Sequence, residues 1–289
     1  MLSSPVVLFG QEQRHQVVKR FEGVKARGDY IIVVDASKTM VPVVAEVRRA
    51  VASLVSQLPE GDHLSILRFA NQADEYLPDR TITDTNRENL VQEIMSLANP
   101  TGTRTDLGAG IARALQELSR PDFGDVQFLF FISDFCHDPP SDSQWFGAQT
   151  WRVGKNICRS FDPEPLASRA TKILAGHRVR VIVLRLSNAD KRGLEAFRKV
   201  FPGALEVDLE RVSLEQYFRR FQKEVEFEKV AILAGQEISD ARIQVMLSQT
   251  AVESQPGEET QVEVRISHTM AHLPVLFRVP STIESVDKD

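Results

Sequence analysis

Short apolar runs alternate with segments of helical period from about residue 29 to 225. The runs at 30–34 (YIIVV) and 126–132 (VQFLFFI) are continuous, as in strands that helices cover on both faces. The segments between such runs place apolar residues three and four positions apart, which is typical of a helix with one buried face. This alternation predicts βα units around a largely parallel sheet.

The same pattern gives approximate bounds for the elements. We expect an edge hairpin formed by 63–69 and an extended stretch near Tyr76 and Leu77. Thr85–Glu88 and Ser213–Gln216 have the capping-box pattern of a helix start. The other strands are expected at 30–34, 126–132, 179–186 and 204–208, and the helices at 44–58, 85–97, 107–118, 163–175, 190–200 and from 213 onward. The predicted fold class is α/β, with a Rossmann-like doubly wound, mostly parallel sheet, one antiparallel edge strand and a small C-terminal β appendage.

Three segments are predicted along the chain: an N-terminal segment at 1–27, an α/β domain at 28–228 and a β-rich appendage at 235–285. In the appendage, apolar residues alternate with period two on both sides of a turn-like stretch at 255–258, which predicts a hairpin. The stretch at 274–279 is a candidate third strand. Because so few strands make a poor independent domain, we expect them to recruit a candidate strand near residues 4–9 or to pack on the main domain.

Composition narrows the class of partner. The 289 residues carry a formal net charge of -5, which argues against nucleic acid or an anionic membrane as the main partner. No stretch approaches the roughly 18 apolar residues of a spanning helix, and the first residues lack a basic start followed by an apolar run. We therefore expect a soluble protein without direct membrane insertion, in the cytoplasm, with a periplasmic or membrane-tethered context as the alternative.

Oxygen-bearing side chains follow two of the predicted strands. Asp35 comes directly after the first strand and begins the sequence Asp-Ala-Ser-Lys-Thr, which adds the hydroxyls of Ser37 and Thr39. Asp134 follows the run at 126–132. In an open α/β sheet, ligands gather at the carboxyl ends of the strands, and hard oxygen donors suit Mg²⁺, Ca²⁺ or Mn²⁺. A divalent metal site is expected there.

The order of these patterns resembles the von Willebrand factor A (VWA) domain family over roughly residues 28–226. The family signature is Asp-x-Ser-x-Ser after the first strand, a Thr in a Gly-rich loop, and an Asp after a later strand. Here Asp35, Ser37 and Thr39 match the first part, Thr103 in Gly-Thr-Arg-Thr the second, and Asp134 the third.

The resemblance implies a metal ion-dependent adhesion site (MIDAS) that binds Mg²⁺, or Ca²⁺ or Mn²⁺, and keeps one coordination position for an Asp or Glu of a partner protein. It also implies a binding module for adhesion or for assembly of a multiprotein complex, with no catalytic residues. Two positions depart from the family pattern. Thr39 replaces the second Ser but keeps a hydroxyl, and Phe135 stands where the family usually has Gly, which we expect to narrow access to the metal.

The Asp35 segment has two other interpretations. Ser, Thr and Asp routinely cap helices, so the cluster could be structural. Haloacid dehalogenase-like phosphotransferases also place Asp-x-x-x-Thr after a first strand, and Asp35 would then be a nucleophile beside Mg²⁺. Against that enzyme, Ser37 is neither acid nor base, no clear Lys motif precedes Asp134, and the Gly-Thr-Arg-Thr loop is left unexplained.

The segment 135–163 is long for a βα connection and contains both tryptophans and both cysteines. It is either a recognition loop that contacts the partner or a loop whose aromatic side chains pack onto the domain. Cys136 and Cys158 with His137 lack the spacing of known zinc sites, so we expect reduced thiols, although a disulfide stays open.

Overall fold

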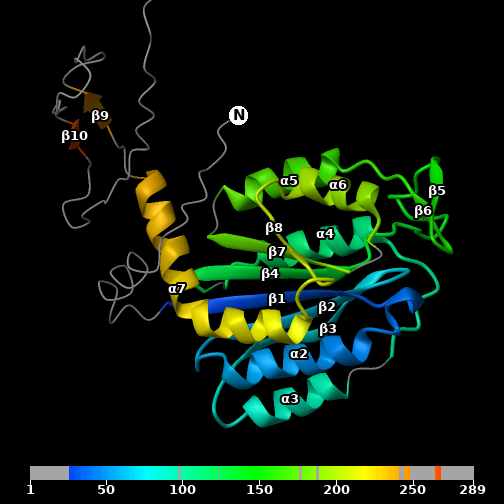
Figure 1. Cartoon of the computed structure of the whole chain (residues 1–289), viewed down its shortest axis with the longest axis horizontal. Helices are drawn as coiled ribbons and strands as arrows, with labels where there is room; N and C mark the ends of the chain where they lie inside the picture. Colours follow the sequence, from blue (N-terminus) through cyan, green and yellow to red (C-terminus); the bar gives the residue numbers. More distant parts are fainter. Residues whose placement is uncertain are drawn as a thin grey trace, which may run out of the picture. The chain divides into compact units, whose positions relative to one another are not determined.

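A six-stranded sheet organises residues 28–208 of the computed structural model (Figure 1). The structure describes residues 26–240 apart from 97–98, 123, 176–177 and 187–188, together with 244–247 and 264–267. The chain divides into two compact units, 1–233 and 234–289, and the sheet belongs to the first.

The strand order is β3-β2-β1-β4-β7-β8. Strands β1, β2, β4, β7 and β8 pair in parallel, and β3 pairs antiparallel to β2 at one edge. This arrangement confirms the mostly parallel, doubly wound sheet with one antiparallel edge strand. The bounds are β1 Gly28–Asp35, β2 His63–Phe69, β3 Ala73–Thr81, β4 Val126–Ser133, β7 Val179–Arg185 and β8 Leu205–Asp208.

Helices cover both faces of the sheet (Figure 1). Alternate residues of β1 point to opposite faces, so Tyr30 and Ile32 enter one core while Ile31 and Val33 enter the other. All four side chains are at most 2% exposed, as expected for a strand covered on both sides. The first core is closed by α2 (Val44–Gln57), α3 (Arg87–Met95) and α7 (Leu214–Asp240), and the second by α4 (Leu107–Leu118), α5 (Glu164–Leu174) and α6 (Lys191–Val200).

One predicted helix cap is confirmed and the other is wrong. Before α7, the backbone N–H of Ser213 donates to Gln216 Oε1 and the N–H of Gln216 donates to Ser213 Oγ, which is a capping box. Before α3, the reciprocal pair is Thr83 and Asn86 instead of Thr85 and Glu88. The Asn side chain accepts at 2.9 Å from the N–H of Thr83, so the turn is closed two residues earlier than the Thr-x-x-Glu pattern indicates.

In the second unit, β9 (Gln244–Leu247) and β10 (Val264–Ser267) pair antiparallel, in agreement with the predicted hairpin. Its turn at 255–258, the candidate strands at 4–9 and 274–279, and nearly all of the predicted segment 1–27 lie outside the described residues. Of the helices in the described part of the chain, none combines the length and apolar character needed to cross a bilayer.

Candidate metal site

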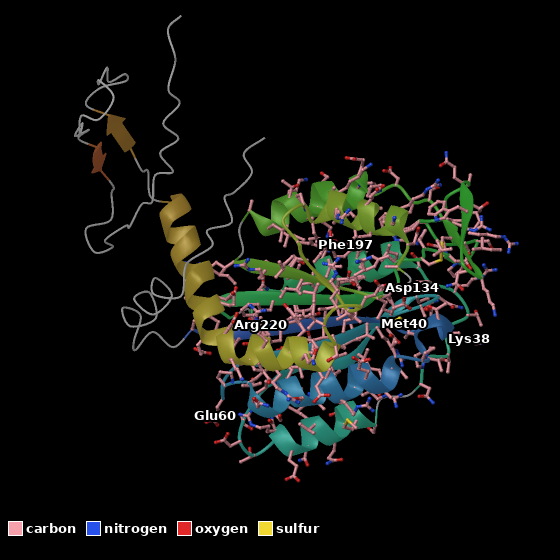
Figure 2. All side chains as sticks on the ribbon, viewed as in Figure 1. Lys38, Met40, Glu60, Asp134, Phe197 and Arg220 are labelled. Carbon is pink, nitrogen blue, oxygen red and sulfur yellow. A yellow bond between two sulfur atoms is a disulfide. The ribbon has the colours of Figure 1, made fainter. Side chains whose placement is uncertain are left out.

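The two candidate acidic ligands stand at the same edge of the sheet because β1 and β4 are parallel neighbours. Val34 pairs with Ile132, so Asp35, the last residue of β1, and Asp134, the first residue after β4, come close together at this edge. Their side chains are 0% and 1% exposed. Figure 2 shows Asp134 at the end of the domain where Lys38 and Met40 of the short helix η1 (Lys38–Met40) also lie.

The turn after β1 orients the first three candidate ligands. Asp35 Oδ1 accepts from the backbone N–H of Ser37 at 2.8 Å, and Asp35 Oδ2 accepts from the hydroxyl of Ser133 at 2.9 Å. Ser37 Oγ and Thr39 Oγ1 are 2.8 Å apart and share a hydrogen bond. One carboxylate and two hydroxyls are therefore held in fixed positions by short-range contacts.

Thr103 reaches this edge through a backbone pairing between two loops. The N–H of Lys38 donates to the Gly102 carbonyl at 2.9 Å, and the N–H of Gly102 donates to the Ala36 carbonyl at 3.2 Å. A Cβ atom at Gly102 would lie 2.2 Å from Ala70 Cβ, so this approach requires glycine. The Thr103 side chain is exposed, and its Oγ1 accepts from Asn71 Nδ2 at 3.4 Å.

Asp134 has one satisfied and one unsatisfied oxygen. Its Oδ1 accepts from the N–H of Cys136 at 3.0 Å. Its Oδ2 is buried and has no hydrogen-bond partner within the described residues. A buried carboxylate oxygen without a donor costs free energy, and a cation would offset that cost.

The raised pKa values of the two carboxylates also favour a cation between them. Burial, followed by the charge of Asp134, raises the pKa of Asp35 to about 7, against the opposing hydrogen bonds from Ser37 and Ser133. Burial likewise raises the pKa of Asp134, and the hydrogen bond from the Cys136 N–H opposes that shift. Among the described residues, no three or more His, Cys, Asp or Glu side chains are grouped so that they could hold a metal ion, so a cation here would need hydroxyl ligands beside the two carboxylates.

A search against protein-family models matches residues 29–201 to the von Willebrand factor type A domain. The match covers more than half of the chain. This chain belongs to the von Willebrand factor type A domain family. The haloacid dehalogenase-like alternative therefore does not describe this domain.

Solved structures share the VWA fold at low sequence identity. A von Willebrand factor type A protein from Catenulispora acidiphila is 13% identical over 69% of this chain and 42% of its own, with a TM-score of 0.48. The PilB minor pilin from Streptococcus sanguinis is 13% identical over 71% of this chain and 63% of its own, with a TM-score of 0.50. The pilus adhesin SpaC from Lactobacillus rhamnosus GG is 10% identical over 81% of this chain and 35% of its own, with a TM-score of 0.51. This chain thus spans less than two thirds of each of the three, and no curated protein matches it.

The VWA domain departs from our expectation at Phe135. The φ of Phe135 is 59°, which lies in the left-handed region that favours glycine. This conformation is the physical reason why glycine suits this position. The side chain is 0% exposed, and its ring lies 5.9 Å from that of Phe131 and 5.6 Å from that of Phe197. The expectation that Phe135 narrows access to the metal was wrong, because this turn directs the ring into the core.

The two cysteines were also predicted wrongly, because Cys136 and Cys158 form a disulfide. His137 is equally unsuited to zinc, since its Nδ1 accepts from the N–H of Leu107 at 3.1 Å and its Nε2 lies 2.9 Å from the Trp145 carbonyl. The segment 135–163 also contains a hairpin that we did not predict, formed by β5 (Thr150–Val153) and β6 (Asn156–Arg159).

The aromatic side chains of this segment differ in burial, and packing onto the domain is confirmed for Trp145. Trp145 packs against α4, where a Cβ atom at Gly108 would lie 2.4 Å from its Cγ. Phe146, in contrast, is 39% exposed. Sequence reasoning also missed Ser133 and Asn71, which orient Asp35 and the Thr103 loop. The only signal for Ser133 was its place directly before Asp134.

Proposed function

We propose that this VWA domain binds a divalent cation, Mg²⁺ or alternatively Ca²⁺ or Mn²⁺, at a MIDAS formed by Asp35, Ser37, Thr39, Thr103 and Asp134. The observation that carries the proposal is the buried Asp134 Oδ2, which lacks a donor within the described residues and lies beside a second buried carboxylate. A cation with hard oxygen ligands offsets both the repulsion and the missing hydrogen bond.

The bound cation would serve to capture a protein partner. Two carboxylates and three neutral hydroxyls leave it able to attract one more carboxylate strongly. Thr103 and Lys38 are exposed at the rim, so an incoming Asp or Glu side chain can approach from solvent. We assign the domain to adhesion or to the assembly of a multiprotein complex, through binding and without catalysis.

The disulfide indicates the kind of cellular compartment in which the protein is located. Disulfides persist in oxidising surroundings and are rare in the cytoplasm. The bond between Cys136 and Cys158 favours a periplasmic or otherwise extracytoplasmic location over the cytoplasm expected from the sequence.

The test is metal binding by Asp35→Ala, with Asp142→Ala as the matched control because Asp142 is an exposed acid of the 135–163 segment. Mg²⁺ at about 100 times its Kd would stabilise the folded protein by about 2.7 kcal/mol, or roughly 5–10 °C in thermal midpoint. We expect this shift in wild type and Asp142→Ala and its loss in Asp35→Ala.

A pull-down with the same three proteins, with and without Mg²⁺, extends the test to partners. A specific partner should be retained by wild type and Asp142→Ala only when Mg²⁺ is present. Equal metal binding and equal partner retention by Asp35→Ala would contradict the proposal. Hydrolysis of a generic phosphate ester by wild type but not by Asp35→Ala would contradict the non-catalytic assignment.

A further inference from the structure

The β5–β6 hairpin presents two different faces. In its register Trp151 is opposite Cys158, and Arg152 is opposite Ile157. Because side chains alternate along a strand, these two pairs lie on opposite faces. Cys158 is 0% exposed, whereas Ile157 is 45% exposed and Arg152 is also exposed. The Trp151 face is thus directed toward the domain and the Arg152 face toward solvent.

The inner face is anchored to the residues around Asp134. Cys158 is bonded to Cys136, whose N–H donates to Asp134 Oδ1 at 3.0 Å. Trp151 Nε1 donates to Asp190 Oδ1 at 3.0 Å, and the N–H of Asp190 donates to the Asp134 carbonyl at 2.7 Å. These contacts hold the hairpin beside the candidate metal site, and β5 and β6 are drawn at the end of the domain where Asp134 and Lys38 are labelled (Figures 1 and 2).

The hairpin is basic, although the whole chain has a net charge of -5. Residues 150–159 contain Arg152, Lys155 and Arg159 and no acidic residue. Arg159 is engaged, since it lies 3.5 Å from Asp138 and stacks over the Phe146 ring. Arg152 and Lys155 are exposed and form no ion pair with any residue that the structure describes.

The turn fixes the position of Lys155. Gly154 and Lys155 connect the two strands, and Gly154 has a φ of 58°, the conformation that glycine supplies at the first position of a tight two-residue turn. With the disulfide on one strand and the indole hydrogen bond on the other, the basic side chains and Ile157 form a preorganised surface.

We propose that the outward face of the β5–β6 hairpin is a second contact surface for the partner, and that the partner is an acidic protein segment. One carboxylate of that segment would bind the cation, further acidic side chains would lie against Arg152 and Lys155, and an apolar side chain would cover Ile157. This inference rests on the proposed metal-dependent capture of a carboxylate. Charge complementarity around the ion then selects acidic segments over isolated carboxylates.

The probe is a pair of fluorescent peptides. In the first, one Asp and one Ile are interspersed with Glu residues, and in the second every Glu is replaced by Gln. Binding to the full chain is measured by fluorescence anisotropy in saturating Mg²⁺. The variants are Asp35→Ala, the hairpin variant Arg152→Glu/Lys155→Glu, and a control, Arg169→Glu/Lys172→Glu, with the same charge change at exposed positions of α5.

Wild type and the α5 control should bind the Glu peptide about tenfold more tightly than the Gln peptide, and raised ionic strength should reduce the difference. The hairpin variant should bind the Gln peptide with the affinity that wild type has for it, and it should bind the Glu peptide no more tightly than that, because its new carboxylates repel the Glu side chains. Its retained, Mg²⁺-dependent binding of the Gln peptide shows that it is folded.

The inference would be overturned by equal affinity of wild type for the two peptides, by an unchanged preference in the hairpin variant, or by an equal loss of preference in the α5 control. Absence of binding to either peptide would also overturn it. Failure of the proposed function is a different result, namely that Asp35→Ala binds the Gln peptide as wild type does.

Discussion

At the scale of single residues, Phe135 combines two opposed effects. Among the described residues it is the only non-glycine residue with a positive φ, a conformation that costs about 1–2 kcal/mol for a residue with a Cβ atom. Its ring offsets that cost by filling the core between Phe131 and Phe197. Backbone and side chain therefore have opposite preferences at this position.

Substitution at Phe135 separates the two effects. Phe135→Ala should lower the free energy of unfolding by about 3–5 kcal/mol, because it leaves a cavity and keeps the backbone strain. Phe135→Gly should be about 1 kcal/mol more stable than Phe135→Ala, since it relieves that strain. Urea denaturation measures both.

Phe201 supplies the control, because it is 1% exposed and has an ordinary φ of -125°. There the order should reverse, and Phe201→Ala should be more stable than Phe201→Gly. The same order of Ala and Gly at both positions would show that the backbone at Phe135 is not strained.

At the scale of elements, His137 joins the 135–163 segment to α4. It is 0% exposed, and its Nδ1 accepts from the first N–H of α4, that of Leu107. The proton of the neutral ring must therefore be on Nε2, which faces the Trp145 carbonyl. Burial lowers the pKa of His137 below its usual 6.5, although the Trp145 carbonyl and the charge of Asp106 oppose the shift.

This lowered pKa predicts a pH dependence. The unfolded chain binds a proton to His137 near pH 6.5 and the folded protein does so only at lower pH, so stability falls as the pH decreases below about 6.5. The difference in thermal midpoint between wild type and His137→Asn should become smaller as the pH is lowered from about 7.5 to about 5.5, which brackets the usual histidine pKa of about 6.5. Asp35, whose raised pKa acts in the opposite direction, contributes equally to both proteins and cancels in the comparison. A constant difference between the two midpoints would refute this role.

At the scale of the whole first unit, α7 is joined to the far end of the sheet by a buried ion pair. Lys229 Nζ lies 2.8 Å from Asp62 Oδ2, and Asp62 also accepts from the hydroxyl of Tyr30 and the N–H of Gly28. Lys229 and Asp62 are 1% and 2% exposed. Removal of the Lys229 ammonium group would leave the buried Asp62 carboxylate without its charged partner.

Truncated chains test how much of α7 is needed for the stability of the first unit. A chain ending at Asp240 should unfold cooperatively, with a thermal midpoint within a few degrees of the full chain. A chain ending at Glu228 lacks Lys229 and should lose about 3–5 kcal/mol. Lys229→Met in the full chain separates the ion pair from the loss of helix, and it should account for most of this difference. Equal stability of the two truncated chains would show that the ion pair contributes little.

The sequence by itself determined the strands of the six-stranded sheet, most of the helices and the family, because these follow from periodicity and from motifs within a few residues. It also pointed to the five candidate ligands, and parallel pairing of β1 with β4 brings their segments to one edge. Its errors had two causes. The cap before α3 is local, but two overlapping polar pairs compete there and Asn86 pairs with Thr83. The thiols of Cys136 and Cys158 are 22 residues apart, and only the fold brings them together.

Only the tertiary structure decided the contacts between distant segments, including those that form the surface beside the candidate metal site. Asp62 and Lys229 are 167 residues apart in sequence, and no local pattern pairs them. The direction of Phe135 depends on a positive φ that the residue type itself disfavours. The β5–β6 hairpin is too short for a clear period and is held by side-chain contacts to Cys136 and Asp190. Such contacts exist only after distant segments have packed, which is why the candidate metal-binding turn could be recognised in the sequence and the basic surface beside it could not.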